Sequence, residues 1–253
     1  MRYFITLMYH GAAYHGWQIQ QNAISVQQIL NEALSRILKE PILTTGSGRT
    51  DTGVHARKQV AHFDTEKTLD ETVYLYKFNA VLPFDISITQ LQAVTDQAHA
   101  RFDATSRSYQ YMIHQKKNPF LNGLSYFFPR AVDIELMNQA AIQLVQYGKR
   151  DYASFSKSKT QTTSFNCHIL RAHWHVIEED RCMFAITADR FLRGMVRTLV
   201  GTLLDIGTHT TTLAGFPAII ESSDRRKAGR SADACGLYLT EVIYPADIYQ
   251  QDD

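Results

Sequence analysis

The segment from Gly46 to Asp64 constrains this chain most, because it joins a glycine-rich loop to a run of strand-forming residues. Glycines at positions 46, 48 and 53 permit positive φ angles and the close approach of another backbone. Between them stand one guanidinium, Arg49, and one carboxylate, Asp51. These groups can meet in an irregular loop, and a carboxylate beside a cation tends to stay ionised. The pattern therefore predicts a nucleophile or a stabiliser of positive charge.

Two other interpretations of this loop stay open. A glycine-rich hairpin loop with a solvated aspartate has the same composition, and short motif matches include false positives. Asp51-Thr52-Gly53 also spells the D-T-G of aspartic proteases, in which two such loops bring together carboxylates that share a proton. The chain has no second D-T-G or D-S-G, so a protease would require a dimer, and Arg49 would oppose the shared proton.

Composition indicates a globular protein of one large domain or two modest ones, with 253 residues, 45% of them apolar and 20% charged. A net charge of +1 gives no overall basic field, so any nucleic-acid site must come from local clusters of lysine and arginine. No apolar run approaches the length of a membrane span, and no signal peptide opens the chain. Three widely spaced cysteines favour a reducing cytoplasm and no disulfide framework.

No metal site is expected. Cys167 and His168 are followed by His173 and His175, but their spacing matches none of the usual zinc patterns. The last two alternate around Trp174 as residues of a strand do.

Strand-like and helix-like segments alternate along the chain, which predicts an α+β protein. The clearest helix begins at Ser25, a good N-cap with Gln28 completing a capping box, and ends before Pro41. Further helices are predicted for 70–79, 133–148, 190–205 and 217–222, and strands for 3–9, 58–64, 86–94, 107–113, 182–188 and 236–245.

Three arginines recur near the start of the helix predicted for 190–205. Arg190, Arg193 and Arg197 stand at i, i+3 and i+7 and would line one side of that helix. Cations in a first turn oppose the helix dipole, so the pattern predicts an anionic partner. A solvated basic face is the simpler alternative.

Several segments together resemble one known family, the TruA-type tRNA pseudouridine synthases. Residues 48–55 differ from the family's G-R-T-D-A-G-V-H only at Thr52. Residues 9–20 resemble Y-D-G-x-x-Y-x-G-W-Q-x-Q, with His10 in place of the aspartate. The R-x-Y-x-Y, F-L-x-x-M-V-R and G-L-Y-L segments of the family are matched at 107–111, 191–197 and 236–239. The resemblance runs in order from Tyr3 to Pro245.

The resemblance implies a fold of two similar α/β halves, joined through mixed, mainly antiparallel sheets with a central active-site cleft. We expect the halves at 1–104, carrying the catalytic aspartate loop, and 105–253, carrying the stacking tyrosine and the arginine helix. The family works as a homodimer, with tRNA lying across both subunits, and modifies positions 38 to 40 of the anticodon arm. The reaction requires no cofactor.

Residue roles follow from the matched motifs. Asp51 takes the catalytic role, Arg197 pairs with it, and Tyr109 stacks on the target uracil. We assign substrate binding to Arg49, Tyr109 and Phe191, and contacts with the RNA backbone to Arg57, Lys58, Arg190 and Arg193.

The chemistry of the reaction agrees with a single carboxylate. Pseudouridine forms when the bond between ribose C1′ and uracil N1 breaks, the base turns, and C1′ bonds to C5. Departure of the base leaves positive charge at C1′, as in glycoside hydrolysis, and uracil leaves as a stabilised anion. Asp51 can therefore act without a second carboxylate.

Two further alternatives stay open. His10 and Thr52 leave room for a paralogue that acts on another RNA uridine. A tRNA-binding protein without catalysis would keep the basic clusters and be indifferent to Asp51.

Overall fold

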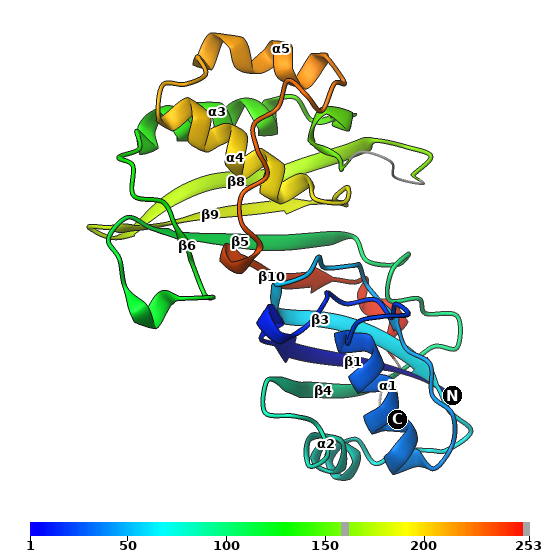
Figure 1. Ribbon diagram of the computed structural model, residues 1–253. Coiled ribbons are helices and arrows are strands. Elements are labelled where there is room, and N and C mark those ends of the chain that lie inside the picture. Colours follow the sequence, from blue (N-terminus) through cyan, green and yellow to red (C-terminus); the bar gives the residue numbers. More distant parts are fainter. Residues whose placement is uncertain (158–161, 250–253) are drawn as a thin grey trace. The chain divides into compact units, whose positions relative to one another are not determined.

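The computed structural model describes residues 1–157 and 162–249, which form two compact units. Unit 1 contains residues 1–105 and the C-terminal residues from Leu239, and unit 2 contains Ser106–Tyr238. Both units combine helices with sheets whose strands pair mainly antiparallel, which confirms the α+β class (Figure 1).

In unit 1 the strand order is β4-β1-β3-β10, with β2 beside β3. β1 pairs antiparallel with β3 on one side and β4 on the other, so it is an interior strand, and it carries buried Ile5 and Leu7. Helix α2 packs on β4, and α1 contacts α2. The elements are β1 (Arg2–Tyr9), α1 (Val26–Leu38), β2 (Thr45–Gly46), β3 (His55–Asp64), α2 (Glu71–Asn79), β4 (Ile86–Val94) and β10 (Leu237–Ile243), which belongs to this unit from Leu239 onward.

The first helix begins where the capping pattern predicted. The Ser25 side chain accepts a hydrogen bond from the Gln28 backbone N–H, which satisfies one of the free donors of the first turn. The apolar stripe, including Leu30, Leu34 and Leu38, is buried. Lys39 at the C-terminus has a left-handed conformation, which turns the chain away before Pro41.

In unit 2 the strand order is β5-β9-β8-β7, and β6 pairs parallel with β5. Helix α3 packs on β8 and on α4, which Figure 1 shows above these strands. The helix predicted for 133–148 is α3: Asp133 caps its N-terminus, and Gly148 lies just beyond its C-terminus with a φ of +61°. The elements are β5 (Ser106–His114), β6 (Tyr126–Phe127), α3 (Ile134–Gln146), β7 (Lys149–Asp151), β8 (Asn166–Glu178), β9 (Arg181–Ala188), α4 (Met195–Gly207) and α5 (Phe216–Glu221).

The helix predicted from Arg190 is wrong at its start, since α4 begins only at Met195. Gly194 has a φ of +71°, a left-handed conformation that interrupts a right-handed helix. The backbone carbonyl of Arg193 accepts a hydrogen bond from Lys157 N–H at 2.8 Å and is thus held by a tertiary contact. Arg190 and Arg193 therefore precede the helix, and the three arginines do not form one helical face.

The C-terminal segment belongs to unit 1, whereas the sequence placed all of 105–253 in a second half. Strand β10 lies next to β3 in the unit 1 sheet. Thr105 N–H also donates to the Ile243 carbonyl at 2.8 Å, and Thr95 N–H to that of Ile248 at 2.9 Å. These long-range hydrogen bonds join segments that composition and local pattern treat as unrelated.

A buried histidine gives unit 1 an expected sensitivity to acid. Burial, together with the nearby Arg2 and His99, lowers the pKa of His62 to about 4 from the usual 6.5. Its Nδ1 accepts a hydrogen bond from Ala100 N–H at 3.1 Å, which requires the neutral ring.

The unfolded chain takes up the His62 proton near pH 6.5 and the folded chain only near pH 4. We therefore expect stability to fall as the pH is lowered between these values, by up to about 3 kcal/mol. Urea unfolding of wild type and His62→Asn at several pH values measures this. The variant keeps an acceptor near the Nδ1 position and should show a flatter dependence, whereas equal slopes would contradict the assignment.

Candidate functional site in the loop around Asp51

The Asp51 loop of unit 1 lies against the segment that follows β1. A Cβ on Gly11 would lie 2.0 Å from the Val54 carbonyl oxygen, and a Cβ on Gly16 would lie 2.4 Å from that of Thr50. Gly16 also has a φ of +87°, a conformation that side chains disfavour. Both positions therefore require glycine, because backbone meets backbone there.

Hydrogen bonds hold the loop on both sides of Asp51. The Thr50 side chain bonds to Tyr9 Oη at 2.8 Å in a buried setting, and the Thr50 carbonyl accepts from Trp17 N–H at 3.2 Å. The Asp51 carbonyl accepts from Val54 N–H at 3.1 Å. The Asp51 backbone is thus fixed while its side chain is partly exposed, which suits a group that must meet a large substrate.

The bond between Tyr9 and Thr50 provides a test of this support. In Tyr9→Phe the buried Thr50 hydroxyl loses this partner, so we expect a loss of about 1–2 kcal/mol in unfolding free energy. The double variant Tyr9→Phe/Thr50→Val removes both polar groups. Its loss of unfolding free energy should be smaller than the sum of the losses in the two single variants. Urea unfolding of the four proteins measures the coupling, and strict additivity would argue against it.

His10, where the family motif has aspartate, lies beside the end of the loop. Its ring centroid is 4.6 Å from that of His55, the last residue of the G-R-T-D motif. His55 is buried, and its Nδ1 accepts a hydrogen bond from Gly11 N–H at 3.0 Å. An imidazole therefore occupies the corner where the family has a carboxylate.

A second motif residue of the same segment is also held by a distant partner. The Tyr14 hydroxyl donates a hydrogen bond to Asp85 at 2.6 Å. Burial of Tyr14, and to a smaller extent this hydrogen bond, raises the pKa of Tyr14.

In unit 2, the structure brings two predicted residues together. Tyr109 on β5 and Phe191 form an edge-to-face pair with ring centroids 5.2 Å apart and an interplanar angle of 90°. Both are partly exposed, so an aromatic surface remains for a base. Tyr111 differs, because it is fully buried and its hydroxyl donates to the Asp233 carbonyl at 2.7 Å. Burial raises its pKa, and Tyr111 is a structural residue.

Arg197 lies in the first turn of α4 and is anchored to the segment before β10. Its Nε donates to the Ala232 carbonyl at 2.7 Å, and its own carbonyl accepts from Ala232 N–H at 3.0 Å. Hydrogen bonding by the Cys235 N–H lowers the pKa of Asp233, and Arg197 contributes to that lowering. The Arg197 guanidinium is therefore oriented by backbone before any substrate binds.

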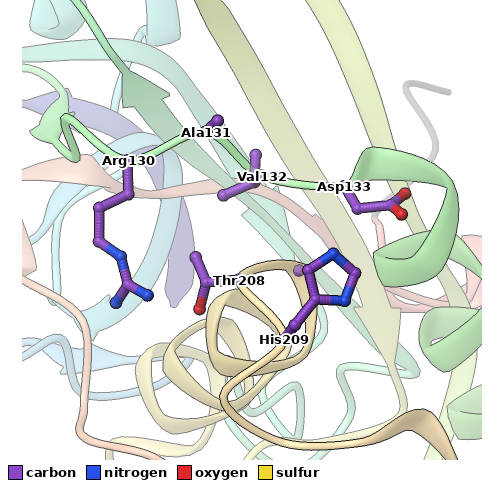
Figure 2. Close-up of a pocket in the computed structure, with 7 residues that line it drawn as sticks. Arg130, Ala131, Val132, Asp133, Thr208 and His209 are labelled. Atoms are coloured by element: carbon purple, nitrogen blue, oxygen red, sulfur yellow. The ribbon is translucent and has the colours of Figure 1, made fainter.

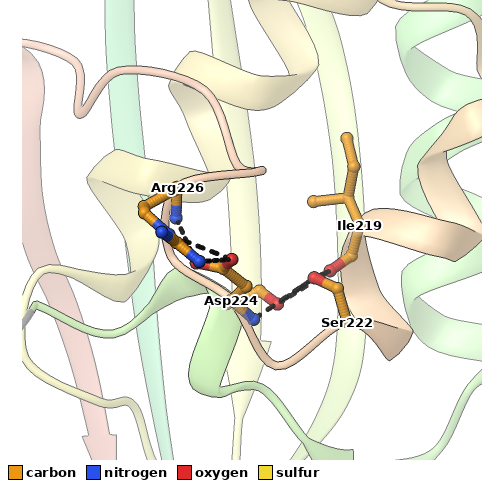
Figure 3. A network of polar contacts seen from close by, with 5 residues as sticks. Ile219, Ser222, Asp224 and Arg226 are labelled. Carbon is orange, nitrogen blue, oxygen red and sulfur yellow. Dashed lines mark hydrogen bonds and ion pairs between the residues drawn. The ribbon is translucent and has the colours of Figure 1, made fainter.

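Residues 224–230 contain three arginines and one lysine, and part of their positive charge is compensated by an aspartate of the same segment. Arg226 forms an exposed ion pair with Asp224 at 2.7 Å, and Asp224 N–H donates to the Ser222 hydroxyl (Figure 3). Ser222 in turn donates to the Ile219 carbonyl at the end of α5. Arg225 donates to the Ala228 carbonyl and the Ser231 hydroxyl, which ties the run together. Much of this cluster therefore has a structural role.

The other predicted residues are distributed over both units. Arg49 and Arg57 are exposed in unit 1, and Lys58 is partly exposed. In unit 2, Arg193 is exposed and Arg190 donates to the Thr162 hydroxyl at 3.4 Å. The roles of these residues, and the pairing of Arg197 with Asp51, stay predictions.

A surface depression of about 550 Å³ lies elsewhere in unit 2, between the start of α3 and the end of α4. Figure 2 shows Arg130, Asp133 and His209 among its lining side chains. No predicted site residue lines it. Within 1–157 and 162–249, no cluster of three or more His, Cys, Asp or Glu side chains is arranged to hold a metal ion. No helix in this part of the chain is long and apolar enough to cross a membrane.

Sequence reasoning missed several supporting residues. Tyr9, Gly11, Gly16 and Trp17 were visible as motif positions, but their function as a support for the Asp51 loop was not. Asp85 and Ala232 carried no local signal, because each acts through a contact far along the chain.

Comparison with known proteins agrees with these motifs. The family model described as tRNA pseudouridine synthase matches residues 5–103 and 140–245. A protein named tRNA pseudouridine synthase A from Parabacteroides distasonis is 46% identical over 253 residues, covering 100% of this chain and 99% of the relative. Proteins of the same name from Bacteroides thetaiotaomicron and Bacillus licheniformis are 48% and 38% identical, covering 99% and 96% of this chain and 93% and 99% of the relatives. These matches favour this family over the aspartic proteases.

Proposed function

We propose, given that this chain belongs to the tRNA pseudouridine synthase family, that it isomerises uridine at positions 38 to 40 of the tRNA anticodon arm with Asp51 as the catalytic nucleophile. The chain is a tRNA pseudouridine synthase, an isomerase. The observation that best supports the role of Asp51 is the loop itself, whose backbone is fixed on both sides while the carboxylate is partly exposed.

The proposed mechanism uses the charge of Asp51. As the bond between C1′ and N1 breaks, the Asp51 carboxylate bonds to C1′ and takes up the positive charge that develops there, while the base departs as an anion. The base turns, and its C5 then bonds to C1′ and displaces the carboxylate, so atoms balance without an oxidant or a cofactor. The C5 proton then leaves to a base that we do not assign.

The remaining site residues receive roles by chemistry. We propose that Arg197 keeps Asp51 ionised and that Tyr109 stacks on the target uracil, with Phe191 supporting the ring. Arg49 fills the space of the flipped base or binds its phosphate. Arg57, Lys58, Arg190 and Arg193 contact the RNA backbone, where cations supply affinity without sequence preference.

The same membership leads us to propose that the chain acts as a homodimer, with one tRNA lying across both copies. Its place of action is then the cytoplasm, where it meets its tRNA substrate.

Tritium release from tRNA labelled at uridine C5 tests the proposed positions. Two transcripts are compared, one with uridines at 38, 39 and 40 and one with cytidines at these three positions. We expect release from the first only, because tritium leaves C5 when C1′ bonds there. Equal release from both would indicate a paralogue that acts on another uridine. Tight binding without release from either would indicate a tRNA-binding protein without catalysis, or a tRNA that is not the target.

A further inference from the structure

The turn from His99 to Asp103 in unit 1, here called the braced turn, is held by hydrogen bonds between its own side chains and backbone. The His99 N–H donates to the Asp103 carboxylate at 2.7 Å. His99 Nδ1 accepts from the N–H groups of Arg101 and Phe102 at 3.1 and 3.3 Å. The turn is therefore closed by its own side chains.

Neighbouring elements also fix the braced turn. Ala100 N–H donates to the buried His62, and the Ala100 carbonyl accepts from the Tyr244 hydroxyl at 2.6 Å. The Arg2 guanidinium donates to the Ala98 carbonyl at 2.9 Å, just before the turn. β1, β3 and the segment after β10 thus all contribute contacts, so the turn has little freedom to lose on binding.

This rigid turn presents an aromatic ring and a cation to solvent. Phe102 is 74% exposed although a phenylalanine is strongly apolar. The Arg101 guanidinium lies 5.7 Å from the centre of its ring, and the His99 ring centroid is 4.3 Å away. Isolated exposed aromatic residues are common and need no explanation. An exposed ring that stands beside a guanidinium on a fixed backbone is a less common combination, and it indicates a binding site more strongly than an isolated ring does.

We propose that the braced turn binds an unpaired nucleotide of the tRNA substrate, with the base stacked on Phe102 and the neighbouring phosphate bound by Arg101. Aromatic rings stack on any base, and a guanidinium binds phosphate through paired donors. Because the chain has a net charge of only +1, RNA binding must come from such local combinations. One ring with one cation matches a nucleotide, whereas a stable protein interface needs about 800 Å² on each partner.

Equilibrium binding of an unmodified tRNA transcript to the full chain tests the stacking contact. In Phe102→Ala we expect affinity to fall between about 5-fold and 150-fold, the range of one base stacked on an aromatic residue. Phe102→Tyr should bind within about twofold of wild type, and Phe102→Leu should stay weak, because stacking needs a ring rather than apolar area. Phe84→Ala, which removes a fully exposed ring elsewhere in unit 1, is the matched control.

The salt dependence of the same binding tests the phosphate contact. For wild type, a plot of the logarithm of the tRNA binding constant against the logarithm of the salt concentration has a negative slope. Arg101→Gln should make this slope about 1 unit less steep, the effect of one lost phosphate contact. Phe102→Ala should keep the wild-type slope, because the ring releases no counterion. Arg36→Gln, which removes an exposed arginine on α1, should change neither the affinity for tRNA nor the salt slope.

The outcomes separate this inference from the proposed function, on which it rests. If wild type binds tRNA and Phe102→Ala binds equally well, the inference is overturned while the function stands. If wild type binds no tRNA, the proposed function fails first. If Phe102→Ala instead changes the sedimentation of the free protein, the braced turn is a contact between protein copies, and the RNA assignment is wrong.

Discussion

Replacing Asp51 with asparagine is expected to lower the rate of pseudouridine formation by at least about 10³-fold, while tRNA binding persists. Asparagine keeps the size and most of the hydrogen bonding of aspartate but lacks the charge that stabilises a positive C1′. The side chain is partly exposed, so the variant should unfold within about 0.5 kcal/mol of wild type. Single-turnover tritium release from uridine-labelled tRNA measures the chemical step.

The matched control for this substitution is Asp96→Asn, which removes an exposed carboxylate from the same unit. It should keep the wild-type rate. A normal rate in Asp51→Asn would remove Asp51 from the mechanism. A loss of both rate and binding would instead indicate that Asp51 acts in holding RNA.

Replacing Gly16 with alanine is expected to lower both stability and activity. The new Cβ would lie 2.4 Å from the Thr50 carbonyl oxygen, and a φ of +87° is unfavourable for alanine. Overpacking and the strain of a left-handed backbone conformation together should lower the free energy of unfolding by about 2–4 kcal/mol. Because the contact is with the backbone next to Asp51, the loop must move, and a displacement of about 1 Å can cost 10²-fold in rate.

Thermal unfolding and turnover of Gly16→Ala should be compared with those of Gly48→Ala. Gly48 lies in the same loop, but a Cβ there meets no atom within 4 Å. The control should change stability by less than about 0.5 kcal/mol. Equal effects of the two substitutions would mean that the glycines serve loop flexibility in general, and that close packing against Thr50 is unimportant.

Local pattern was sufficient for most of the secondary structure. The Ser25 cap, the helix at 133–148 and the strand at 86–94 were all predicted, because capping, helical periodicity and side-chain alternation depend on neighbours in sequence. The helix expected from Arg190 was wrong at its start for the opposite reason, because a contact from a distant segment decided the local conformation. Its apolar periodicity continued through a residue, Gly194, whose backbone conformation depends on its surroundings in the fold.

The candidate site also combines features that local sequence predicts with features that only the fold decides. The motif at 48–55 pointed to Asp51, and the motif at 107–111 to Tyr109, because order and identity of residues carry that information. The pairing of Tyr109 with Phe191 and the anchoring of Arg197 on Ala232 join residues 82 and 35 positions apart, respectively. Such contacts follow from strand register and chain path, which no local window contains.

The sequence by itself determined the class of the protein, the loop that carries its carboxylate and the ends of its best-capped helices. Only the tertiary structure decided why Gly16 and Tyr9 matter to that loop, why residues from Leu239 belong with the first unit, and how the braced turn displays Phe102. The reason is physical. Caps, turns and periodicity arise from interactions between near neighbours, whereas packing and long-range hydrogen bonds exist only once distant segments have met.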